Sequence, residues 1–295
     1  MVTLNQLRIF LAVARREHMT KASQDINLSQ SAVSMAISDL EEKLKGPLFE
    51  RTGRNLKLND RGRLLRREAS QILNQADDMI SLFTNDEGEL HGDLKVGASS
   101  TIGNYLLPGI IGRFKKRHPQ VTIDLDIANT GQIESRLLDL TLDLGLTEGP
   151  VQHKDISSSN WLTDRLVVIA APGYFEEKKS GLTVDELKQV KWIMREKGSG
   201  TRDVFERAIQ PHAENIDIFL TFGHTEAVKQ AVMAGLGVGC LSWYTVSREI
   251  DRGNMIQLEV PELSLERTLR IINREGSHIS RLCNGFCEFL KRETE

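Results

Sequence analysis

Three absences narrow the class of protein before any motif is considered. The 295-residue chain holds no apolar run near the roughly 20 residues that a membrane-spanning helix requires. Its first residues lead straight into an amphipathic pattern, so we expect no signal peptide and no membrane partner. It has only three cysteines, Cys240, Cys283 and Cys287, which is an odd number. We therefore expect a cytoplasmic protein with reduced thiols, of which the last two are buried on a terminal helix.

Signatures of catalysis and of nucleotide binding are missing as well. The glycines of Gly235-Leu-Gly-Val-Gly239 follow a predicted helix and lead into a strand, the reverse of the order in a dinucleotide-binding turn. Gly198-Ser-Gly200 lacks the lysine of a P-loop. No Ser/His/Asp set and no metal-ligand spacing stands out. We therefore expect no catalytic residues, no metal and no cofactor, which argues against an enzyme.

Residues 20 to 45 predict a helix, a tight turn and a second helix. Thr20 is a suitable N-cap for the first helix, and Ser29 is a suitable N-cap for the second. The apolar residues of the second helix recur at helical spacing and must pack inward; they are Val33, Ile37, Leu40 and Leu44. The polar residues left outward are Gln30, Ser31, Ser34 and Ser38. Such short side chains suit base edges in the DNA major groove, although a pair of short helices with a polar face also occurs without any DNA role.

The residues around this motif complete a small domain. An amphipathic helix with Leu4, Leu7, Leu11 and Ala14 precedes it and can cover its apolar side. After it, residues 48–58 alternate around a Thr-Gly-Arg-Asn turn, which predicts a winged hairpin. Arg51 and Arg54 at the tip would lie beside the DNA backbone or minor groove, or they are solvated surface charges.

Charge is distributed unevenly along the chain. Residues 1 to 67 carry 13 Lys and Arg against 7 Asp and Glu, a surplus of six positive charges, whereas the whole chain has a net charge of −3. A basic segment on an acidic protein indicates a local contact with a polyanion, because neutralised phosphates supply most non-specific DNA affinity.

A long helix is predicted after Asn59, a plausible N-cap. Apolar residues at positions 65, 69, 72, 76, 79 and 83 step alternately by four and three, the spacing of a coiled coil. We expect this helix to pair with its copy, since two reading heads on one stalk match a two-fold DNA site. The alternative is an ordinary amphipathic helix packed on its own domain.

These runs, taken in order, resemble one family. Leu28-Ser-Gln-Ser-Ala-Val-Ser34, Leu40-Glu-Glu-Lys-Leu44 and Pro47-Leu-Phe-Glu-Arg-Thr-Gly-Arg54 look like the LysR-type transcriptional regulators. The resemblance implies a winged helix-turn-helix domain at 1–58, a linker helix and hinge at 59–87, and an effector domain at 88–295. Together with the polar face of the second helix, the resemblance gives the expected DNA contacts, which are Thr20, Ser29, Gln30, Ser31, Ser34, Arg51 and Arg54. Ser31 and Met35 depart from the family pattern, in which a proline and a polar or basic residue are more usual.

The rest of the chain alternates strand and helix patterns, which predicts an α/β sheet with covering helices. Predicted strands are 93–98, 121–127, 142–146, 166–170, 192–194, 216–222 and 238–240, and predicted helices include 102–117 and 131–140. The resemblance implies two lobes like those of a periplasmic binding protein. Lobe I would span about 92–163 with 269–295, and lobe II would span about 164–268.

Polar runs at the predicted strand ends form the candidate effector site. Ligands in such sheets lie at the carboxyl ends of strands, beside helix N-termini. The candidate residues are Ser99, Ser100, Thr101, Asn129, Glu148, Arg195, Ser199, Thr201 and His224. His224 could equally be a helix-cap residue. A carboxylate such as Glu148 repels an anion unless an arginine balances it or the ligand brings a proton. We expect a small oxyanion, with Arg195 and Glu148 setting selectivity.

Within the family, the runs Ala98 to Pro108, Glu148-Gly-Pro150 and Arg195 to Arg202 are similar to the YeiE branch, which is associated with sulfite sensing. Regulators of carbon-fixation genes share part of the first run. The predicted partners are therefore double-stranded operator DNA, a small anionic effector such as sulfite, and further copies of the chain in a homodimer or homotetramer. An organic-acid effector, or a second domain that only assembles subunits without a ligand, remains an alternative.

Overall fold

The computed structural model describes residues 1–52, 55–83, 90–151, 153–175, 182–211 and 216–293. The chain divides into two compact units, residues 1–89 with 276–281 and residues 90–275 with 282–295. Within the described ranges, no helix combines the length and apolar character needed to cross a membrane.

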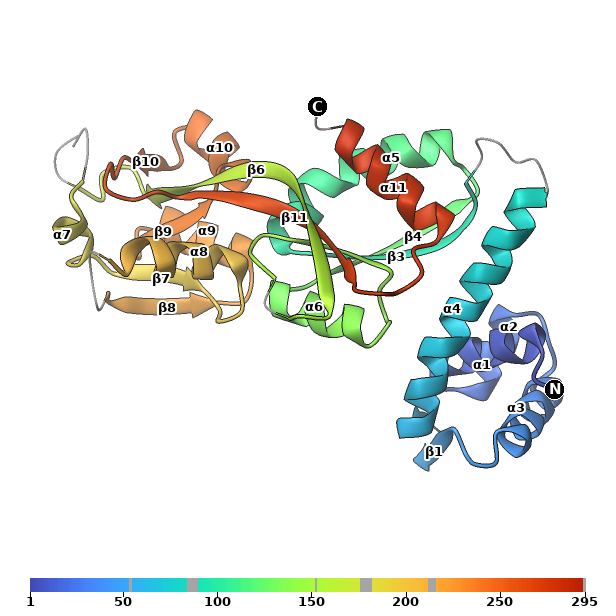
Figure 1. The fold of residues 1–295 in the computed structure, drawn as a ribbon. Helices are drawn as coiled ribbons and strands as arrows, with labels where there is room; N and C mark the ends of the chain where they lie inside the picture. Colours follow the sequence, from blue (N-terminus) through green and yellow to red (C-terminus); the bar gives the residue numbers. More distant parts are fainter. Residues whose placement is uncertain (53–54, 84–89, 152, 176–181, 212–215, 294–295) are drawn as a thin grey trace. The chain divides into compact units, whose positions relative to one another are not determined.

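Three helices form the core of the first unit: α1 (Leu4–Arg16), α2 (Met19–Asp25) and α3 (Gln30–Lys43) (Figure 1). Thr3 caps α1 in a capping box with Gln6. Apolar side chains of all three helices meet in one cluster, which includes Phe10, Val13, Ala22, Val33, Ile37 and Leu40. The inward stripe predicted for the second helix is therefore confirmed, with Leu44 partly buried.

The two predicted helix caps have different outcomes. Ser29 accepts a hydrogen bond from the backbone N–H of Ala32 at 3.1 Å, as an N-cap should. Thr20 is not a cap, because α2 begins at Met19, the residue before Thr20, and His18 takes the cap position. The Thr20 hydroxyl lies within the helix and donates instead to Oε1 of Gln30 at 3.2 Å. Thr20 has a hydroxyl that could cap a helix, but the residue in the cap position is His18, which makes no side-chain cap hydrogen bond.

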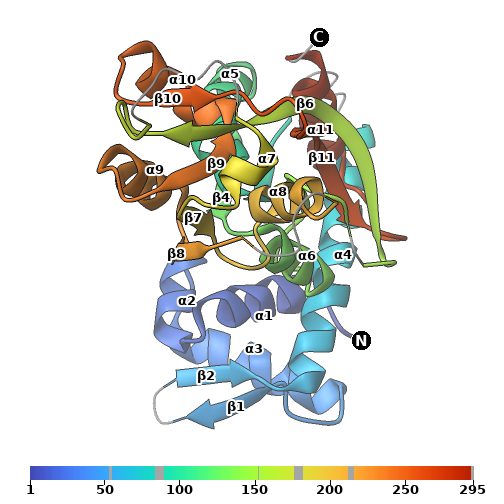
Figure 2. The same cartoon turned by 90° about the vertical axis from the view of Figure 1, so that its left-hand side faces the viewer.

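The predicted hairpin is present. Strands β1 (Phe49–Thr52) and β2 (Asn55–Leu58) pair antiparallel, with Thr52 opposite Asn55. Figure 2 shows the two strands side by side next to α3. Phe49, Leu56 and Leu58 are buried against the helical cluster, which fixes the hairpin to the domain. Residues 53–54 at its tip lie outside the described residues.

Helix α4 (Asp60–Phe83) follows, capped by Asn59, whose Oδ1 accepts from the N–H of Gly62 at 2.8 Å. The apolar stripe predicted for pairing divides between two faces. Ala69 is fully buried in the domain core, joined by Leu73, which the predicted spacing had omitted. Ile72 and Met79 are exposed, and so are Leu64 and Ile80. The predicted stripe thus combines residues that pack on the domain with residues left on the outer face.

The second unit is built on a mixed sheet in the order β4-β3-β5-β11-β6-β9-β7-β8, with β10 added beside β6. The strands are β3 (Gly92–Ala98), β4 (Val121–Ile127), β5 (Leu144–Thr147), β6 (Ile156–Ala170), β7 (Trp192–Arg195), β8 (Ile218–Phe222), β9 (Val238–Ser242), β10 (Ile256–Leu258) and β11 (Glu266–Arg274). Strands β3, β4 and β5 are parallel to one another, and β7 is parallel to β8 and β9.

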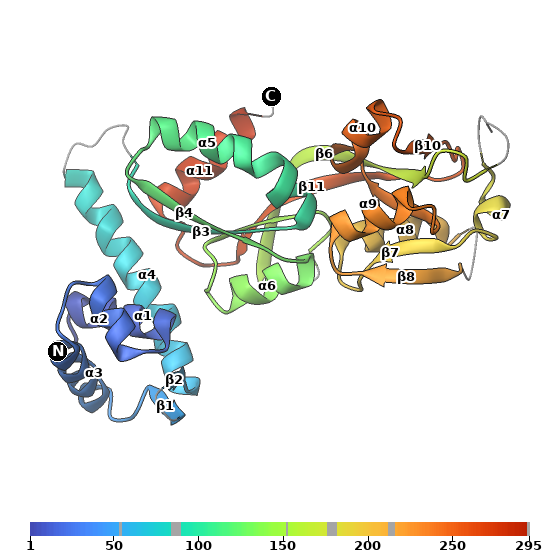
Figure 3. The same ribbon diagram turned by 180° about the vertical axis from the view of Figure 1, so that it is seen from behind.

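Helices cover both faces of each half of this sheet (Figure 1). In the half that we call lobe I, α5 (Leu107–Arg117) and α11 (Arg281–Arg292) share one apolar cluster, and α6 (Thr130–Leu138) covers the other face. In lobe II, α8 (Gly200–Ile209) packs in one cluster and α9 (Thr225–Met233) with α10 (Trp243–Asp251) in another (Figure 3). The short helix α7 (Val184–Leu187) lies beside the α8 cluster.

The two lobes are joined by β6 and β11, which pair antiparallel from Ile156 to Arg165 (Figures 1 and 3). The sequence pattern missed β11 and predicted only the last five residues of β6, because the first half of β6 is polar and exposed. It also predicted one helix over 102–117. The structure instead has a π-helical turn, η1 (Ile102–Leu106), before α5. Such turns occur mostly as local irregularities near functional sites.

Candidate functional site

The outward face of α3 carries the predicted DNA-reading residues. Gln30 and Ser31 are exposed and Ser34 is partly buried. The hydroxyls of Ser29 and Ser31 lie 3.0 Å apart at the start of the helix, where free backbone N–H groups favour anions. Met35, on the same face, is 74% exposed. The face therefore offers hydroxyl, amide and thioether groups without a side-chain charge.

The predicted arginines of the hairpin cannot be placed. Arg54 lies outside the described residues, and only the backbone of Arg51 is described, in β1. Lys57, on the neighbouring strand, is exposed and can supply a cation near the hairpin.

In the second unit, the predicted effector residues lie where strands end and helices begin. Ser99, Ser100 and Thr101 join β3 to η1, and Asn129 caps α6 through its side chain. Ser199 and His224 stand at the N-cap positions of α8 and α9, and neither makes a side-chain cap hydrogen bond. The lobes approach closely here: a Cβ added to Gly200 would lie 3.0 Å from the Cβ of Glu148.

A cavity of about 700 Å³ lies between the lobes. Ser100, Asn129, Arg195 and His224 from the predicted set line it. The other lining residues are Asn104, Tyr105, Ile127, Ala128, Gln132, Glu196, Gly223, Thr225 and Glu226. The structure thus brings four of the nine predicted residues to one cavity.

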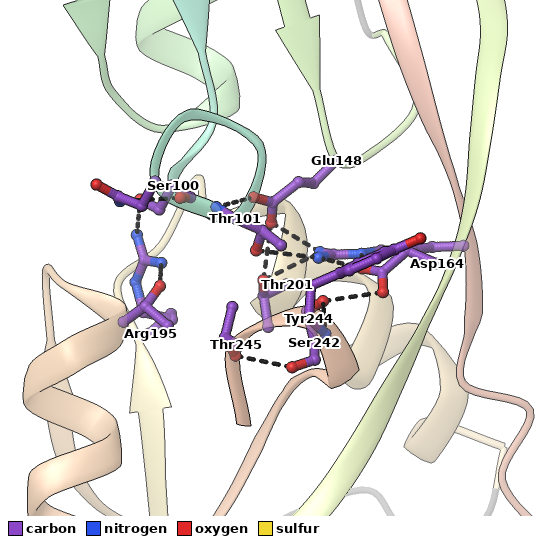
Figure 4. Close-up of polar contacts among 12 residues, drawn as sticks. Ser100, Thr101, Glu148, Asp164, Arg195, Thr201, Ser242, Tyr244 and Thr245 are labelled. Atoms are coloured by element: carbon purple, nitrogen blue, oxygen red, sulfur yellow. Dashed lines mark hydrogen bonds and ion pairs between the residues drawn. The ribbon is translucent and has the colours of Figure 1, made fainter. Parts of the chain in front are cut away.

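Arg195 is the main cationic group of this cavity, although only 3% of it is exposed. Its Nη1 donates to Thr225 Oγ1 at 2.7 Å, and its Nη2 donates to Ser100 Oγ at 3.3 Å (Figure 4). Its Nε donates to a carboxylate oxygen of Glu196 at 2.8 Å. Because Ser100 belongs to lobe I and the others to lobe II, the guanidinium group bridges the two lobes.

Glu148, Thr101 and Thr201 form a different cluster, around Arg267 (Figure 4). Nη1 of Arg267 lies 2.7 Å from Oε2 of Glu148, and its Nε donates to Oδ2 of Asp164 at 2.7 Å. Burial alone would raise the pKa of Glu148, but Arg267 and the hydrogen bonds from Thr101 and Thr201 lower it to about 2. Arg267 is thus the arginine that a carboxylate in this position was expected to require.

Asp164, the second carboxylate on Arg267, differs from Glu148. Its Oδ1 accepts from Ser242 Oγ at 2.9 Å. Burial raises its pKa, against the lowering effects of Arg267 and Ser242. Cys240 lies nearby and its pKa is raised to about 12 by burial, so its thiol is protonated at neutral pH. All three cysteines are free and buried; burial was predicted for Cys283 and Cys287 but not for Cys240.

Two further predicted residues, Ser99 and Ser199, are buried between the lobes. In the part of the chain that the structure describes, the hydroxyls of Ser99, Thr130 and Thr147 are buried without a hydrogen-bond partner.

The sequence pattern did not find several residues of the site. Tyr105 and Arg267 were not predicted, whereas Thr225 belongs to a strand-end loop, 223–225, that the sequence indicated without selecting this residue. Arg267 offered one signal: a charge at an inward position of the strand Glu266-Arg-Thr-Leu-Arg-Ile-Ile272. Lys229, buried in α9, pairs with Glu249 at 2.6 Å and lies over the Tyr105 ring at 5.7 Å from its centroid. No cluster of His, Cys, Asp and Glu that could hold a metal ion occurs among the residues that are described.

A winged helix-turn-helix unit and an α/β unit with a cavity between two lobes define a ligand-responsive DNA-binding regulator. Comparisons with known proteins agree. Residues 4–63 match the model of the bacterial regulatory helix-turn-helix protein, lysR family, and residues 87–295 match that of the LysR substrate binding domain. The chain belongs to the LysR family of transcriptional regulators, and its relatives are regulators and not enzymes.

Individual relatives cover nearly the whole chain. The transcriptional regulator YeiE of Escherichia coli (strain K12) is 38% identical over 288 residues, which is 98% of this chain and 97% of that protein. A full-length OxyR variant of Pseudomonas aeruginosa has a similar fold, with a TM-score of 0.81 at 23% identity over 100% of this chain and 95% of its own. The regulatory domain of CcmR from Synechocystis, solved in complex with 2-PG, has a TM-score of 0.65 and 29% identity over 70% of this chain and 98% of its own.

Proposed function

We propose that this regulator senses a small oxyanion, such as sulfite, that binds beside Arg195 in the cavity between the lobes. The observation that carries the proposal is the position of Arg195. Its guanidinium group is buried, lines the cavity and already bonds hydroxyls from both lobes, Ser100 and Thr225. An oxyanion there would accept from the guanidinium group and from those hydroxyls, which are the donors that bind such ions strongly.

The start of α9 adds to this preference for an anion. Its N-cap residue, His224, makes no side-chain cap hydrogen bond, so the first N–H groups of the helix can serve a ligand. The positive end of the α9 dipole also favours a bound anion. The acidic neighbours are already paired, Glu196 with Arg195 and Glu226 with Lys229. Both pairs reduce the repulsion that a bound anion would meet.

A second candidate is an organic anion, which the size of the cavity favours. About 700 Å³ lies within the range of cavities that hold drug-sized ligands and exceeds what a single sulfite needs. Tyr105 and Ile127 give part of the wall an apolar surface. The CcmR domain, at 29% identity, was solved in complex with 2-PG. An organic anion would keep its acidic group at Arg195 and extend toward Tyr105.

For the first unit, we propose that α3 reads the major groove through Ser29, Gln30, Ser31 and Ser34. Thr20, which bonds Gln30, would hold that amide in place, and Arg51 and Arg54 would contact the backbone. The exposed Ile72 and Met79 of α4 support a homodimer through this helix, since an unpartnered apolar face is normally covered in an assembly. We further propose a homotetramer that acts on promoter DNA in the cytoplasm.

Effector binding would act by favouring one arrangement of the lobes and therefore of the subunits. A ligand can shift such an equilibrium only by its difference in affinity for the two states. Contact with Ser100 in lobe I and Thr225 in lobe II supplies that difference, because both contacts exist together only when the lobes are close.

The test is the thermal shift of the full-length protein with sulfite, sulfate, phosphate and small carboxylates at equal ionic strength. A ligand that binds only the folded state raises its Tm. We expect sulfite to raise it in the native protein and in Ser158→Ala, an exposed control on β6, and to have less effect in Ser100→Ala and Thr225→Ala. A response to carboxylates alone would favour the organic anion, and silence to every anion would favour a domain that only assembles subunits.

A further inference from the structure

Glu148 occupies the kind of position that a bound anion takes at a strand end. It follows β5 and points toward the opposite lobe, and 2% of it is exposed. In Figure 4 its carboxylate lies between Thr101 and Thr201. These two residues were predicted from the sequence to hold a free oxyanion, but the structure shows that they hold a carboxylate of the chain itself.

The donors around this carboxylate come from three separate segments. The backbone N–H of Thr101, just before η1 in lobe I, donates to Oε1 at 2.7 Å. The hydroxyl of Thr201, in the first turn of α8 in lobe II, donates to Oε2 at 2.9 Å. Arg267 on β11 approaches Oε2 at 2.7 Å. An N–H group near a helix start, a hydroxyl and a guanidinium group are the donors of an oxyanion site.

An ordinary buried ion pair does not require this arrangement. Arg267 already has a carboxylate partner in Asp164, which lies opposite it in the β6–β11 ladder. With Glu148 the cluster has two carboxylates for one guanidinium group. Hydrogen bonds from Thr101 in lobe I and Thr201 in lobe II stabilise the second carboxylate, so Glu148 links the two lobes in addition to Arg267, which bonds the hydroxyls of both threonines.

We propose that Glu148 is a built-in anion that fills this site, excludes free oxyanions from it and links the lobes. It thereby determines specificity: an effector anion is left with the other cavity, which Arg195 lines. This consequence for the effector rests on the proposed function, whereas the occupation of the site by Glu148 does not. Removing the carboxylate should leave a vacant site that accepts a small carboxylate from solution.

A second cavity gives such an anion a path. It has a volume of about 390 Å³ and is lined by Glu148 and Arg267 together with Arg207 and Arg270. The lining also includes the exposed Glu266, but once Glu148 is removed the three arginines outnumber this carboxylate and would raise the local anion concentration. Formate, which has the carboxylate of Glu148 and little else, is therefore the probe of choice, followed by acetate.

The experiment compares full-length Glu148→Ala with Glu148→Gln. We expect Glu148→Ala to lower the Tm by about 10 °C, since it leaves donors unpaired in a buried site. Formate should restore several degrees of that loss, and acetate fewer. In Glu148→Gln the amide still fills the site, so the Tm should fall without formate-dependent recovery. Chloride at the same ionic strength measures the general effect of salt in both variants.

Three outcomes would overturn the proposal. They are an unchanged Tm in Glu148→Ala, equal recovery of both variants by formate, and a Glu148→Ala protein that stays insoluble even in formate while Glu148→Gln is as stable as the native chain. A Glu148→Ala protein that folds only in formate would support it. The readout contains no sulfite, so it stands whether or not the effector proposed for the Arg195 side is correct.

Discussion

The two units of this protein place their polar groups in opposite ways. The first unit has an apolar core, and its candidate reading residues, such as Gln30 and Ser31, stand exposed on the surface of α3. In the second unit most of the candidate residues, such as Arg195 and Glu148, are buried, and the two lobes each have their own apolar clusters. Substitution of exposed polar residues therefore has little effect on stability, whereas substitution of buried polar residues changes both stability and ligand binding.

The same contrast occurs on a smaller scale between two arginines of the second unit. Arg267 and Arg195 are both almost fully buried and each bonds two hydroxyls, but Arg267 is held by two carboxylates whereas Arg195 is held by one carboxylate and the carbonyl of Gly223. Arg195 borders the larger cavity, whereas Arg267 borders the smaller one and bonds the cluster of Glu148, Thr101 and Thr201 that links the lobes. We infer that Arg267 is committed to structure and that Arg195 retains capacity for a ligand.

The largest expected effect is that of Arg267→Met. This change leaves Glu148 and Asp164 buried without their cation, and removing one partner of a buried ion pair costs about 3–5 kcal/mol. Urea unfolding of the full chain measures it. Arg270→Met, on the same strand and partly exposed, should cost less than about 1 kcal/mol. Equal losses in the two variants would contradict the structural role assigned to Arg267.

The next effect is a dependence of stability on pH that arises from Glu148. Its pKa is about 2 in the folded protein and 4.5 when unperturbed, so its carboxylate stabilises the fold above about pH 4.5 and this contribution is lost as the pH falls toward 2. The difference corresponds to about 3 kcal/mol. Asp164 acts with the opposite sign. Its pKa is raised in the folded protein, so its charged form destabilises the fold, and protonation on lowering the pH removes this destabilisation.

Unfolding of the native chain and of Glu148→Gln, measured from pH 6 downward, isolates this contribution. We expect the stability difference between the two proteins to shrink as the pH falls from 4.5 to about 2. Carboxylates distant from Glu148 titrate in both proteins and cancel in the comparison, whereas Asp164 contributes to the difference because the charge of Glu148 helps to raise its pKa. A difference that stays constant with pH would show that Glu148 is not held as a carboxylate by Arg267.

The sequence predicted what depends on local patterns. The inward face of α3 and the Ser29 cap follow from residues within one helix, and β4 was predicted at its observed bounds because apolar and polar residues alternate from Val121 to Ile127 between two helices. Four predicted effector residues line the cavity, since the ends of parallel strands meet at one edge.

What the sequence did not predict depends on pairing between distant segments. Arg267 meets Glu148 across 119 positions of the chain, and only the register of β11 against β5 and β6 brings them together. The first half of β6 is exposed on most sides, so it lacks the apolar pattern from which strands are predicted. The stripe on α4 was interpreted as a single seam, but Ala69 is buried in the core of its own domain whereas Ile72, about one turn further on, is exposed.

The third prediction concerns Arg195. In Arg195→Gln the amide can still bond Thr225 but loses the charge and the planar donors, so we expect at least about tenfold weaker binding of the effector anion. Stability should fall by less than in Arg267→Met, because Arg195 has one carboxylate partner to leave unpaired instead of two. Calorimetric titration with sulfite measures the affinity. Arg165→Gln, which removes a cation stacked on Trp243, is the control for general loss of positive charge.

The smallest effect on stability is expected from the exposed face of α3. Gln30→Ala should leave the Tm within about 1 °C or 2 °C of the native value, since its side chain is exposed and bonds only the Thr20 hydroxyl within the described residues. If Gln30 reads a base, its loss should weaken operator binding by about 1–3 kcal/mol and leave non-specific binding unchanged. Lys57→Ala should weaken both kinds of binding alike, because a phosphate contact carries no sequence information. Equal effects of Gln30→Ala on operator and random DNA would place the reading residues elsewhere on the first unit.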